Sequence, residues 1–169
     1  MRRIIGLSIC VLMIAIACNK TSAPTITAAE QLEKDINLID EYLAANNINA
    51  VKLESGVRYV INELGTGATP TKDNCVRFRY VGRVLYDTAV FDSNTTDGIK
   101  SPLKSLVGGM QIGMKQMPVG TKGVIYMPSA YGYGVNGSGT AIPPNSCIYF
   151  EVEIIQLYAY NTLGNYCYE

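Results

Sequence analysis

The chain has 169 residues, the length of one domain with short additions at its ends. Hydrophobic residues make up 48% and charged residues 17% of the sequence, so the composition predicts a folded core rather than disorder. The 14 basic residues balance the 14 acidic ones, which argues against a nucleic-acid partner, since such a protein needs a basic face. The sequence contains no His, which excludes His-based acid–base catalysis, Ser-His-Asp and Cys-His nucleophiles, and His-ligated metal sites.

The first 17 residues have the pattern of an export signal. Arg2 and Arg3 precede an apolar run of about 14 residues, which is shorter than the roughly 20 that a membrane-spanning helix needs. The run ends in Ala-Ile-Ala followed by Cys18, which is similar to a bacterial lipobox, where the Cys is lipidated and becomes the first mature residue. We therefore expect a signal peptide over 1–17, lipidation of Cys18 and attachment to a membrane through the lipid. Plain signal cleavage and a weak membrane anchor are the alternatives.

The mature chain is predicted to begin with a tether and an amphipathic helix. Residues 18–26 are mostly small and polar, which is typical of a short flexible tether that carries the lipid. Thr27 and Glu30 fit a capping box, and a helix is predicted over 27–47. Its apolar stripe consists of Leu32, Ile36, Ile39 and Leu43. This stripe would pack either on the rest of the chain or on a second copy in a homodimer, and the sequence leaves both open.

From residue 55 the hydrophobic period changes from that of a helix to that of strands. Four segments have strand patterns: 57–63, 75–85, 123–127 and 147–157. One short helical stretch is predicted near 110–117, and the segment 131–145, rich in Gly and Pro, is too long for a simple connection. The predicted fold class is therefore α+β, an antiparallel β-sheet wrapped around one short helix, with the amphipathic helix added before it.

Seven short motifs lie in register between residues 55 and 158. They are SGVRY (55–59), VRFRYVG (76–82), VFDS (90–93), MPVG (117–120), MPSAYGYG (127–134), IPPN (142–145) and FEVE (150–153). With these motifs the chain resembles the FKBP family, the macrolide-binding peptidyl-prolyl cis–trans isomerases. The resemblance implies an FKBP-like domain over 55–158, followed by a C-terminal tail over 159–169.

The resemblance also implies isomerase activity on proline-containing polypeptide segments, with macrolides as further ligands. No cofactor or metal is expected, because a dry apolar pocket that holds the carbonyls favours the twisted, less polar amide over the planar one. A chain without His is compatible with this chemistry. Two alternatives stay open: an FKBP-shaped binding module or chaperone with little or no isomerase activity, and a structural lipoprotein that has lost the pocket.

Carried over residue by residue, the resemblance implies a substrate pocket. Its aromatic and aliphatic wall would be Tyr80, Phe91, Val107, Tyr133, Ile142 and Phe150. Asp92 would be the pocket acid, and the Tyr133 hydroxyl and the Val107 N–H would donate to ligand carbonyls. Met110 stands at the floor, where the family usually has Trp, and Leu103 takes the place of a pocket Phe. Without the resemblance, most of these apolar residues would be assigned to an ordinary core, and Asp92 to a turn cap.

Cysteine use is consistent with export. Once Cys10 leaves with the signal and Cys18 is lipidated, three thiols remain, and their spacing fits no metal site. In the FKBP topology the strands that start at Cys75 and Cys147 are antiparallel neighbours, so these two thiols lie far apart. A turn over 161–165 would bring Cys167 back towards Cys75. We predict a Cys75–Cys167 disulfide and a buried free Cys147; three free thiols and a loose tail are the alternative.

The expected location is the cell envelope, where the protein would assist folding of exported proteins. No acidic cluster follows Cys18, and we therefore expect a lipid-anchored protein of the outer membrane that faces the periplasm.

Overall fold

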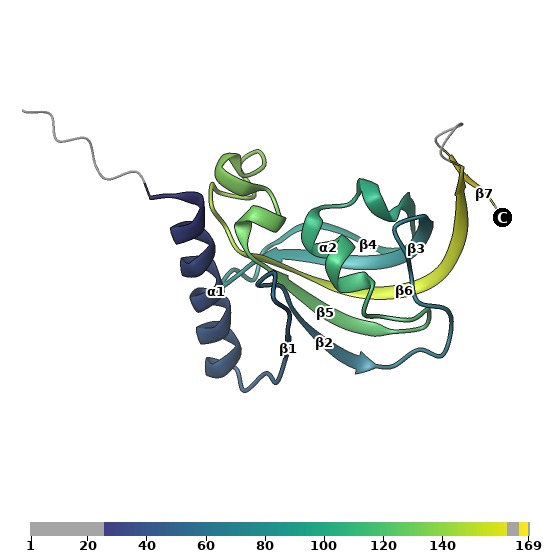
Figure 1. Cartoon of the computed structure of the whole chain (residues 1–169), viewed down its shortest axis with the longest axis horizontal. Helices are drawn as coiled ribbons and strands as arrows, with labels where there is room; N and C mark the ends of the chain where they lie inside the picture. The colour runs from purple at the N-terminus through teal and green to yellow at the C-terminus, as the bar shows by residue number, and fades with distance from the viewer. Residues whose placement is uncertain (1–25, 162–165, 169) are drawn as a thin grey trace, which may run out of the picture.

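The computed structural model describes residues 26–161 and 166–168. In this part of the chain, one long helix lies beside a curved antiparallel sheet that wraps around one short helix (Figure 1). The expected signal peptide, Cys18 and the tether up to residue 25 lie outside the described residues, as do residues 162–165 of the turn expected over 161–165. None of the helices in the described ranges is long and apolar enough to span a membrane.

The sheet has seven strands within the described residues, each antiparallel to its neighbours. Their order is β1-β2-β5-β6-β3-β4, with β7 paired to the end of β6. The strands are β1 (Val51–Lys52), β2 (Arg58–Glu63), β3 (Asn74–Val84), β4 (Val90–Pro102), β5 (Lys122–Met127), β6 (Ile148–Asn161) and β7 (Tyr166–Tyr168). The four predicted strands are confirmed as β2, β3, β5 and β6, and the α+β class is confirmed with them.

One long strand, β4, was not predicted from the sequence. Its residues are mostly exposed on both faces, so they lack the alternation of apolar and polar side chains that marked the other strands. Gly98 adds an irregularity, because its φ of +75° lies in the left-handed region that favours glycine. β4 forms instead through its pairing with β3, in which Phe78 lies opposite Ile99.

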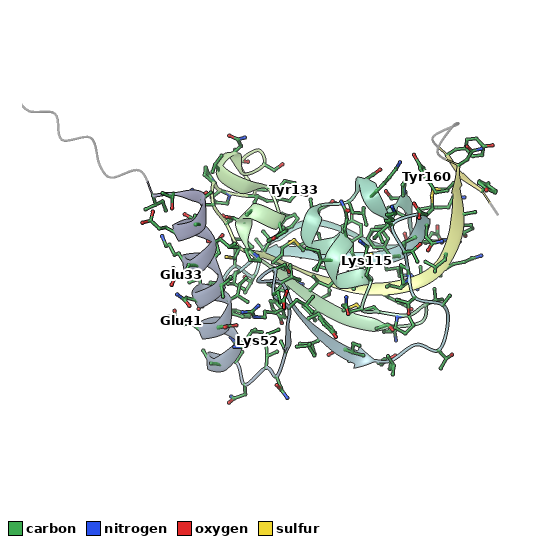
Figure 2. The ribbon with its side chains drawn as sticks, viewed as in Figure 1. Glu33, Glu41, Lys52, Lys115, Tyr133 and Tyr160 are labelled. Atoms are coloured by element: carbon green, nitrogen blue, oxygen red, sulfur yellow. A yellow bond between two sulfur atoms is a disulfide. The ribbon has the colours of Figure 1, made fainter. Side chains whose placement is uncertain are left out.

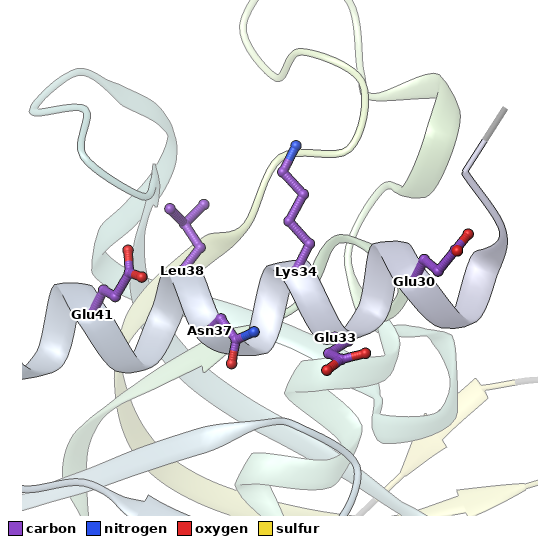
Figure 3. A pocket seen from close by; sticks show the side chains of 6 residues that line it. All are labelled: Glu30, Glu33, Lys34, Asn37, Leu38 and Glu41. Carbon is purple, nitrogen blue, oxygen red and sulfur yellow. The ribbon is translucent and has the colours of Figure 1, made fainter. Parts of the chain in front are cut away.

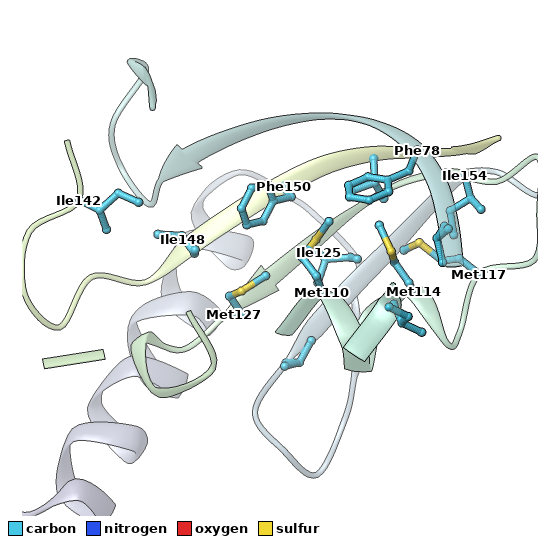
Figure 4. Close-up of a cluster of buried hydrophobic side chains, with 14 residues drawn as sticks. Phe78, Met110, Met114, Met117, Ile125, Met127, Ile142, Ile148, Phe150 and Ile154 are labelled. Atoms are coloured by element: carbon cyan, nitrogen blue, oxygen red, sulfur yellow. The ribbon is translucent and has the colours of Figure 1, made fainter. Parts of the chain in front are cut away.

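The main core lies between the sheet and α2 (Gly108–Met114), the short helix predicted near 110–117. Met110 and Met114 of α2 point into the same cluster as Ile125 and Phe150 of the sheet (Figure 4). A Cβ at Gly113 would lie 2.7 Å from Ile125, so glycine at this position lets α2 approach β5 closely. The flexible methionine side chains fill the remaining space under the curved sheet.

The amphipathic helix is α1 (Ala28–Ala45), and it begins with the predicted capping box between Thr27 and Glu30. Ile39 and Leu43 are buried against Leu85, Tyr126 and Cys147. The apolar stripe therefore packs on the chain's own domain, which was one of the two alternatives. The other alternative, a homodimer formed through this helix, stays a prediction.

The C-terminal residues belong to the sheet rather than to a separate tail. β6 continues to Asn161, since Tyr158 and Tyr160 extend its buried face, and the predicted boundary at residue 158 therefore cuts this strand. A disulfide joins Cys75 to Cys167 with a Cα–Cα distance of 5.7 Å, and Cys147 is a buried free thiol. This is the pair expected from the sequence, and it fastens β7 to the start of β3.

Candidate functional site

A cavity of about 220 Å³ opens between the concave face of the sheet and α2. Its walls come from β3, β4 and β6 of the sheet, from the end of η1 (Leu103–Ser105) with the start of α2, and from the loop after β5. The lining residues are Phe78, Tyr80, Asp92, Ile99, Ser105, Leu106, Val107, Met110, Tyr133 and Phe150. Most of these side chains are apolar or aromatic, which is typical of a pocket for a small apolar group.

Strand alternation places the aromatic wall. Phe78 and Tyr80 are two residues apart on β3, so both point to the concave face, with ring centroids 5.5 Å apart. Phe150 of β6 meets Tyr80 at 5.9 Å and Phe91 at 5.5 Å, in both cases edge to face. Gly82 makes this possible, because a Cβ there would lie 2.7 Å from the rings of both Phe91 and Phe150.

A hydrogen-bonded pair supplies the polar part of the wall. The Tyr80 hydroxyl donates to Asp92 Oδ2 at 2.8 Å, across the β3–β4 pairing. Burial, together with this hydrogen bond and the negative charge of Asp92, raises the pKa of Tyr80 to about 12. The phenol therefore stays neutral and keeps donating throughout the physiological pH range.

Tyr133 lines the same cavity as Asp92. Its ring meets Phe91 edge to face at 6.3 Å, and it lies on the side of its loop that faces α2 (Figure 2). Burial, and secondarily the charge of Asp92, raises the pKa of Tyr133. Among the described residues its hydroxyl has no protein hydrogen-bond partner. This phenol is therefore a neutral donor that a ligand carbonyl in the cavity can use.

Val107 adds a backbone donor at the same wall. It is the N-cap residue of α2, so its N–H takes no part in the hydrogen bonds within that helix.

Met110, the next cavity-lining residue along the chain, is 3% exposed and belongs to the main core. Its thioether chain forms an apolar floor without the flat surface of an indole.

The structure brings six of the nine expected pocket residues to the cavity wall: Tyr80, Asp92, Val107, Met110, Tyr133 and Phe150. Phe91 supports this wall through its ring contacts without lining the cavity. Leu103 and Ile142 are not among the residues that line this cavity. Leu103 begins η1 and is fully buried in the core between the sheet and α2, and Ile142 is a core residue held by its backbone bridge to Ser138.

Four lining residues were missed by sequence reasoning: Phe78, Ile99, Ser105 and Leu106. The alternation on β3 that placed Tyr80 also applies to Phe78, so this signal was present. Ile99 lies opposite Phe78 in the sheet, but that register is invisible unless β4 is recognised as a strand. Ser105 and Leu106 lie in and after η1, where no periodic pattern exists.

A second hollow, of about 450 Å³, lies along the solvent side of α1 and differs from the first in its chemistry (Figure 3). It is lined by Glu30, Glu33, Lys34, Asn37, Leu38 and Glu41. Glu33 and Glu41 point away from the sheet (Figure 2), and Leu38 is the apolar member of this lining. Although larger, this hollow is an open, charged helix surface and offers no dry environment.

The described residues contain no cluster of three or more His, Cys, Asp or Glu side chains that could hold a metal ion.

The sequence of this chain is similar to those of known peptidyl-prolyl cis-trans isomerases. FkpA from Aeromonas hydrophila, an FKBP-type peptidyl-prolyl cis-trans isomerase, is 38% identical over 122 residues, which are 70% of this chain and 45% of that protein. The outer membrane protein MIP from Legionella longbeachae is 32% identical over 122 residues, which are 70% of this chain and 52% of that protein. The chain thus spans about half the length of these curated relatives.

The fold comparison leads to the same group. The crystal structure of a peptidyl-prolyl cis-trans isomerase from Pseudomonas syringae pv. tomato superposes with a TM-score of 0.66 and 27% sequence identity, covering 80% of this chain and 98% of that one. Residues 66–155, more than half of the chain, match the sequence profile of the FKBP-type peptidyl-prolyl cis-trans isomerases. The chain therefore belongs to the FKBP-type peptidyl-prolyl cis-trans isomerase family.

Proposed function

We propose that this protein is an active peptidyl-prolyl cis–trans isomerase that binds X–Pro segments of polypeptides in the cavity above Met110. The observation that carries the proposal is the combination, in one apolar cavity, of the Tyr80–Asp92 pair with the Tyr133 hydroxyl. Family membership supports the reaction class, and the lining of the cavity supports these residues as the groups that bind the substrate.

The reaction needs a changed environment rather than a reactive group. Rotation about a peptide bond meets a barrier of about 18–20 kcal/mol, because the planar amide is stabilised by resonance. At X–Pro bonds the two isomers are nearly balanced, yet exchange takes tens to hundreds of seconds. The twisted transition state loses resonance and charge separation, so an apolar site stabilises it relative to the planar amide. Phe78, Ile99, Met110 and Phe150 provide that apolar surface.

The polar groups would hold the substrate while the bond turns. The proline ring would rest on Met110, and the Tyr133 hydroxyl and the Val107 N–H would donate to the flanking carbonyls. Asp92 would keep Tyr80 fixed through their hydrogen bond and would order the polar side of the cavity. Since Tyr80 and Tyr133 both stay neutral near pH 7, no titration of these phenols is expected to limit turnover there.

A second candidate is a proline-segment binding module or chaperone with little catalysis. Met110 favours it, because a methionine floor is flexible where a rigid ring would hold the proline in one orientation. The two candidates share the binding step and differ in the rate of isomer exchange, so one experiment separates them.

That experiment measures cis–trans exchange in a short Leu-Pro peptide by NMR, with the mature protein added in catalytic amounts. Line broadening or exchange peaks that correspond to an exchange rate well above the uncatalysed rate would establish that the protein is an isomerase. Binding of the peptide without faster exchange would establish the binding module instead. Met110→Trp is the informative variant, since it raises the exchange rate if the missing flat floor limits catalysis.

We further propose that the protein acts on exported polypeptides at the cell envelope, held by a lipid on Cys18 and facing the periplasm. The apolar run that ends at Cys18 supports the anchor, and a relative named as an outer membrane protein supports the location. In a Cys18→Ser variant expressed with its signal, the protein should move from the membrane fraction to the soluble fraction. Continued membrane association of the serine variant would rule out the lipid anchor.

A further inference from the structure

Asp35 is a buried carboxylate on the face of α1 that packs against the domain. It is 1% exposed, with Ile39 and Leu43 buried one and two turns further along the helix. Burying a carboxylate is costly unless its oxygens accept hydrogen bonds. Oδ1 accepts from Gln31 Nε2 at 2.6 Å, and Oδ2 accepts both the N–H of Ser129, at 2.8 Å, and its hydroxyl. A residue 94 positions away in the sequence therefore supplies two of the three donors.

Ser129 begins the turn that leads to the pocket. This turn, η2 (Ser129–Tyr131), follows β5 directly and lies beside α1 (Figure 1). The Tyr131 N–H donates to the Pro128 carbonyl at 3.0 Å, and the Gly132 N–H donates to the Ser129 carbonyl at 2.9 Å. Tyr133, with the hydroxyl that faces the cavity, is the next residue. Only three residues, Ala130, Tyr131 and Gly132, thus separate the Asp35 contact from the pocket donor, and the last two of them are held by these hydrogen bonds.

Apolar contacts hold the same turn from two sides. Ile36 and Pro128 both lie against Gly56, where a Cβ would come within 2.8 Å of Ile36 and 3.2 Å of Pro128. On the pocket side, the ring of Tyr131 lies against Gly108 at the start of α2, where a Cβ would come within 3.3 Å of the ring. A shift of η2 away from α1 would therefore be transmitted to the wall that carries Val107 as well as to Tyr133.

We propose that Asp35 is a positioning residue for isomerisation: its carboxylate holds Ser129, and through η2 it fixes the Tyr133 hydroxyl over the cavity. This role rests on the proposed isomerase function, and it makes α1 part of the pocket's support rather than a spacer between anchor and domain. The other buried residues of α1 are apolar and contribute packing. Asp35 also fixes the position and orientation of Ser129, because the N–H and the hydroxyl of Ser129 both donate to the same carboxylate oxygen, Oδ2.

The test compares two variants at this position with a matched control on the same helix. Asp35→Leu removes the acceptor at similar volume. Asp35→Asn keeps an oxygen for both Ser129 donors, while the Gln31 amide turns to accept from the new amide group, so this variant should rescue the function. Leu43→Ala is the control, since it removes buried surface two turns away from the η2 contact.

The first measurement is kcat/KM for a Leu-Pro peptide. Asp35→Leu should lower it by up to about fivefold, the loss expected when the Tyr133 hydroxyl no longer reaches a substrate carbonyl. Asp35→Asn should stay within about twofold of the parent, and Leu43→Ala should lose stability but not kcat/KM. In a Tyr133→Phe background the effect of Asp35→Leu should largely disappear, because both act through the same hydroxyl. Multiplicative effects would show that Asp35 does not act through Tyr133.

The second measurement does not depend on activity. Amide hydrogen exchange at Tyr131 and Gly132 should become at least about fivefold faster in Asp35→Leu, with β6 amides unchanged. Unchanged exchange at these two amides would overturn the proposal even if the parent is an active isomerase. A parent without isomerase activity would instead overturn the proposed function, and the exchange data would still decide whether Asp35 holds the turn. If Asp35→Leu fails to fold, Ser129→Ala tests the same contact from its other side.

Discussion

Aromatic side chains gather on both faces of the sheet, and the two groups differ in what lies against them. In the pocket cluster, Tyr80, Tyr133 and Phe150 line the cavity together with Asp92, and Phe91 packs edge to face against Tyr133 and Phe150. The helix cluster, Tyr42, Tyr86, Tyr126 and Tyr149, is made of one tyrosine of α1 and three from the sheet and its β3–β4 turn. Tyr149 and Phe150 are neighbours on β6, so strand alternation alone sends one ring to each cluster.

The difference between the clusters lies in space and in hydrogen bonding. In the helix cluster the rings contact one another, with Tyr126 stacked on Tyr149 at 5.4 Å and Tyr42 against both, so α1 closes this surface. In the pocket cluster the rings surround an unfilled volume, and an acid fixes one phenol while another remains available to a ligand. Aromatic content therefore does not mark the site; a cavity with a fixed acid and a neutral donor does.

The largest expected effect comes from a region that belongs to neither cluster. The Cys75–Cys167 disulfide closes a loop of 92 residues, and in the chain-entropy model reduction would lower the free energy of unfolding by up to about 4.6 kcal/mol. Since the bond touches neither cluster, kcat/KM of the protein that remains folded should not change. Denaturant unfolding with and without reductant measures the first effect, and the isomerase assay measures the second.

Cysteine variants provide the control for that experiment. Cys167→Ser should reproduce the effect of the reductant. Burial raises the pKa of Cys147 to about 12, so this thiol stays protonated and should not contribute by exchange. Loss of activity on reduction, in protein that is still folded, would show that the C-terminal strand supports the pocket and that the two regions are not independent.

The second prediction compares one change in each cluster. Asp92→Val should lower kcat/KM about tenfold or more, because it removes a charged hydrogen-bond acceptor and leaves the Tyr80 hydroxyl without its partner. Tyr126→Phe removes a hydroxyl from the helix cluster and should leave kcat/KM unchanged. Circular dichroism checks that both variants keep the fold. Equal activities for Asp92→Val and the parent would remove the acid from the site.

How far the sequence predicts these two regions depends on local periodicity. α1, β3 and β6 carry strong patterns of apolar and polar residues. The alternation along β6 is enough to assign Tyr149 and Phe150 to opposite faces of the sheet. β4 carries no such pattern, and with it the Ile99 wall was missed. Asp35 was missed for a different reason: a charged residue on an amphipathic helix is normally solvent-exposed, and its partner Ser129 is 94 residues away. The residues found through the family motifs came from resemblance, not from periodicity.

The third prediction removes one hydroxyl from each cluster. Tyr133→Phe should lower kcat/KM about fivefold, the loss expected for one neutral hydrogen bond to a substrate carbonyl, mainly through a weaker transition-state interaction. Tyr149→Phe lies on the opposite face and should have no effect on activity. Steady-state kinetics with one peptide at several concentrations gives the split between kcat and KM. An inactive Tyr149→Phe variant would mean that the helix cluster also reaches the substrate.

The smallest expected effect concerns one tyrosine of each cluster, Tyr80 and Tyr126, whose pKa values are both raised to about 12 but for different reasons. For Tyr80 the causes are burial, then the hydrogen bond to Asp92 and its charge. For Tyr126 they are burial, then the neighbouring Tyr42, Tyr149 and Glu151. A raised folded-state pKa means that the native protein holds its protons more tightly than the unfolded chain does. Stability should therefore be constant from neutral pH to about pH 9 and fall as the pH rises from about 10 to about 12.

Asp92→Val separates the two clusters in this titration. Without the carboxylate, the pKa of Tyr80 should fall towards its ordinary value and keep only the part of the shift that burial causes, whereas the pKa of Tyr126 should not move. Tyrosinate absorbance against pH, with Tyr80→Phe and Tyr126→Phe used to assign the two transitions by difference, gives both values. If the two pKa values move together in Asp92→Val, the acid acts on the fold as a whole. If Tyr80 alone moves, the acid acts locally on its hydrogen-bonded phenol, as the contrast between an open and a closed aromatic cluster requires.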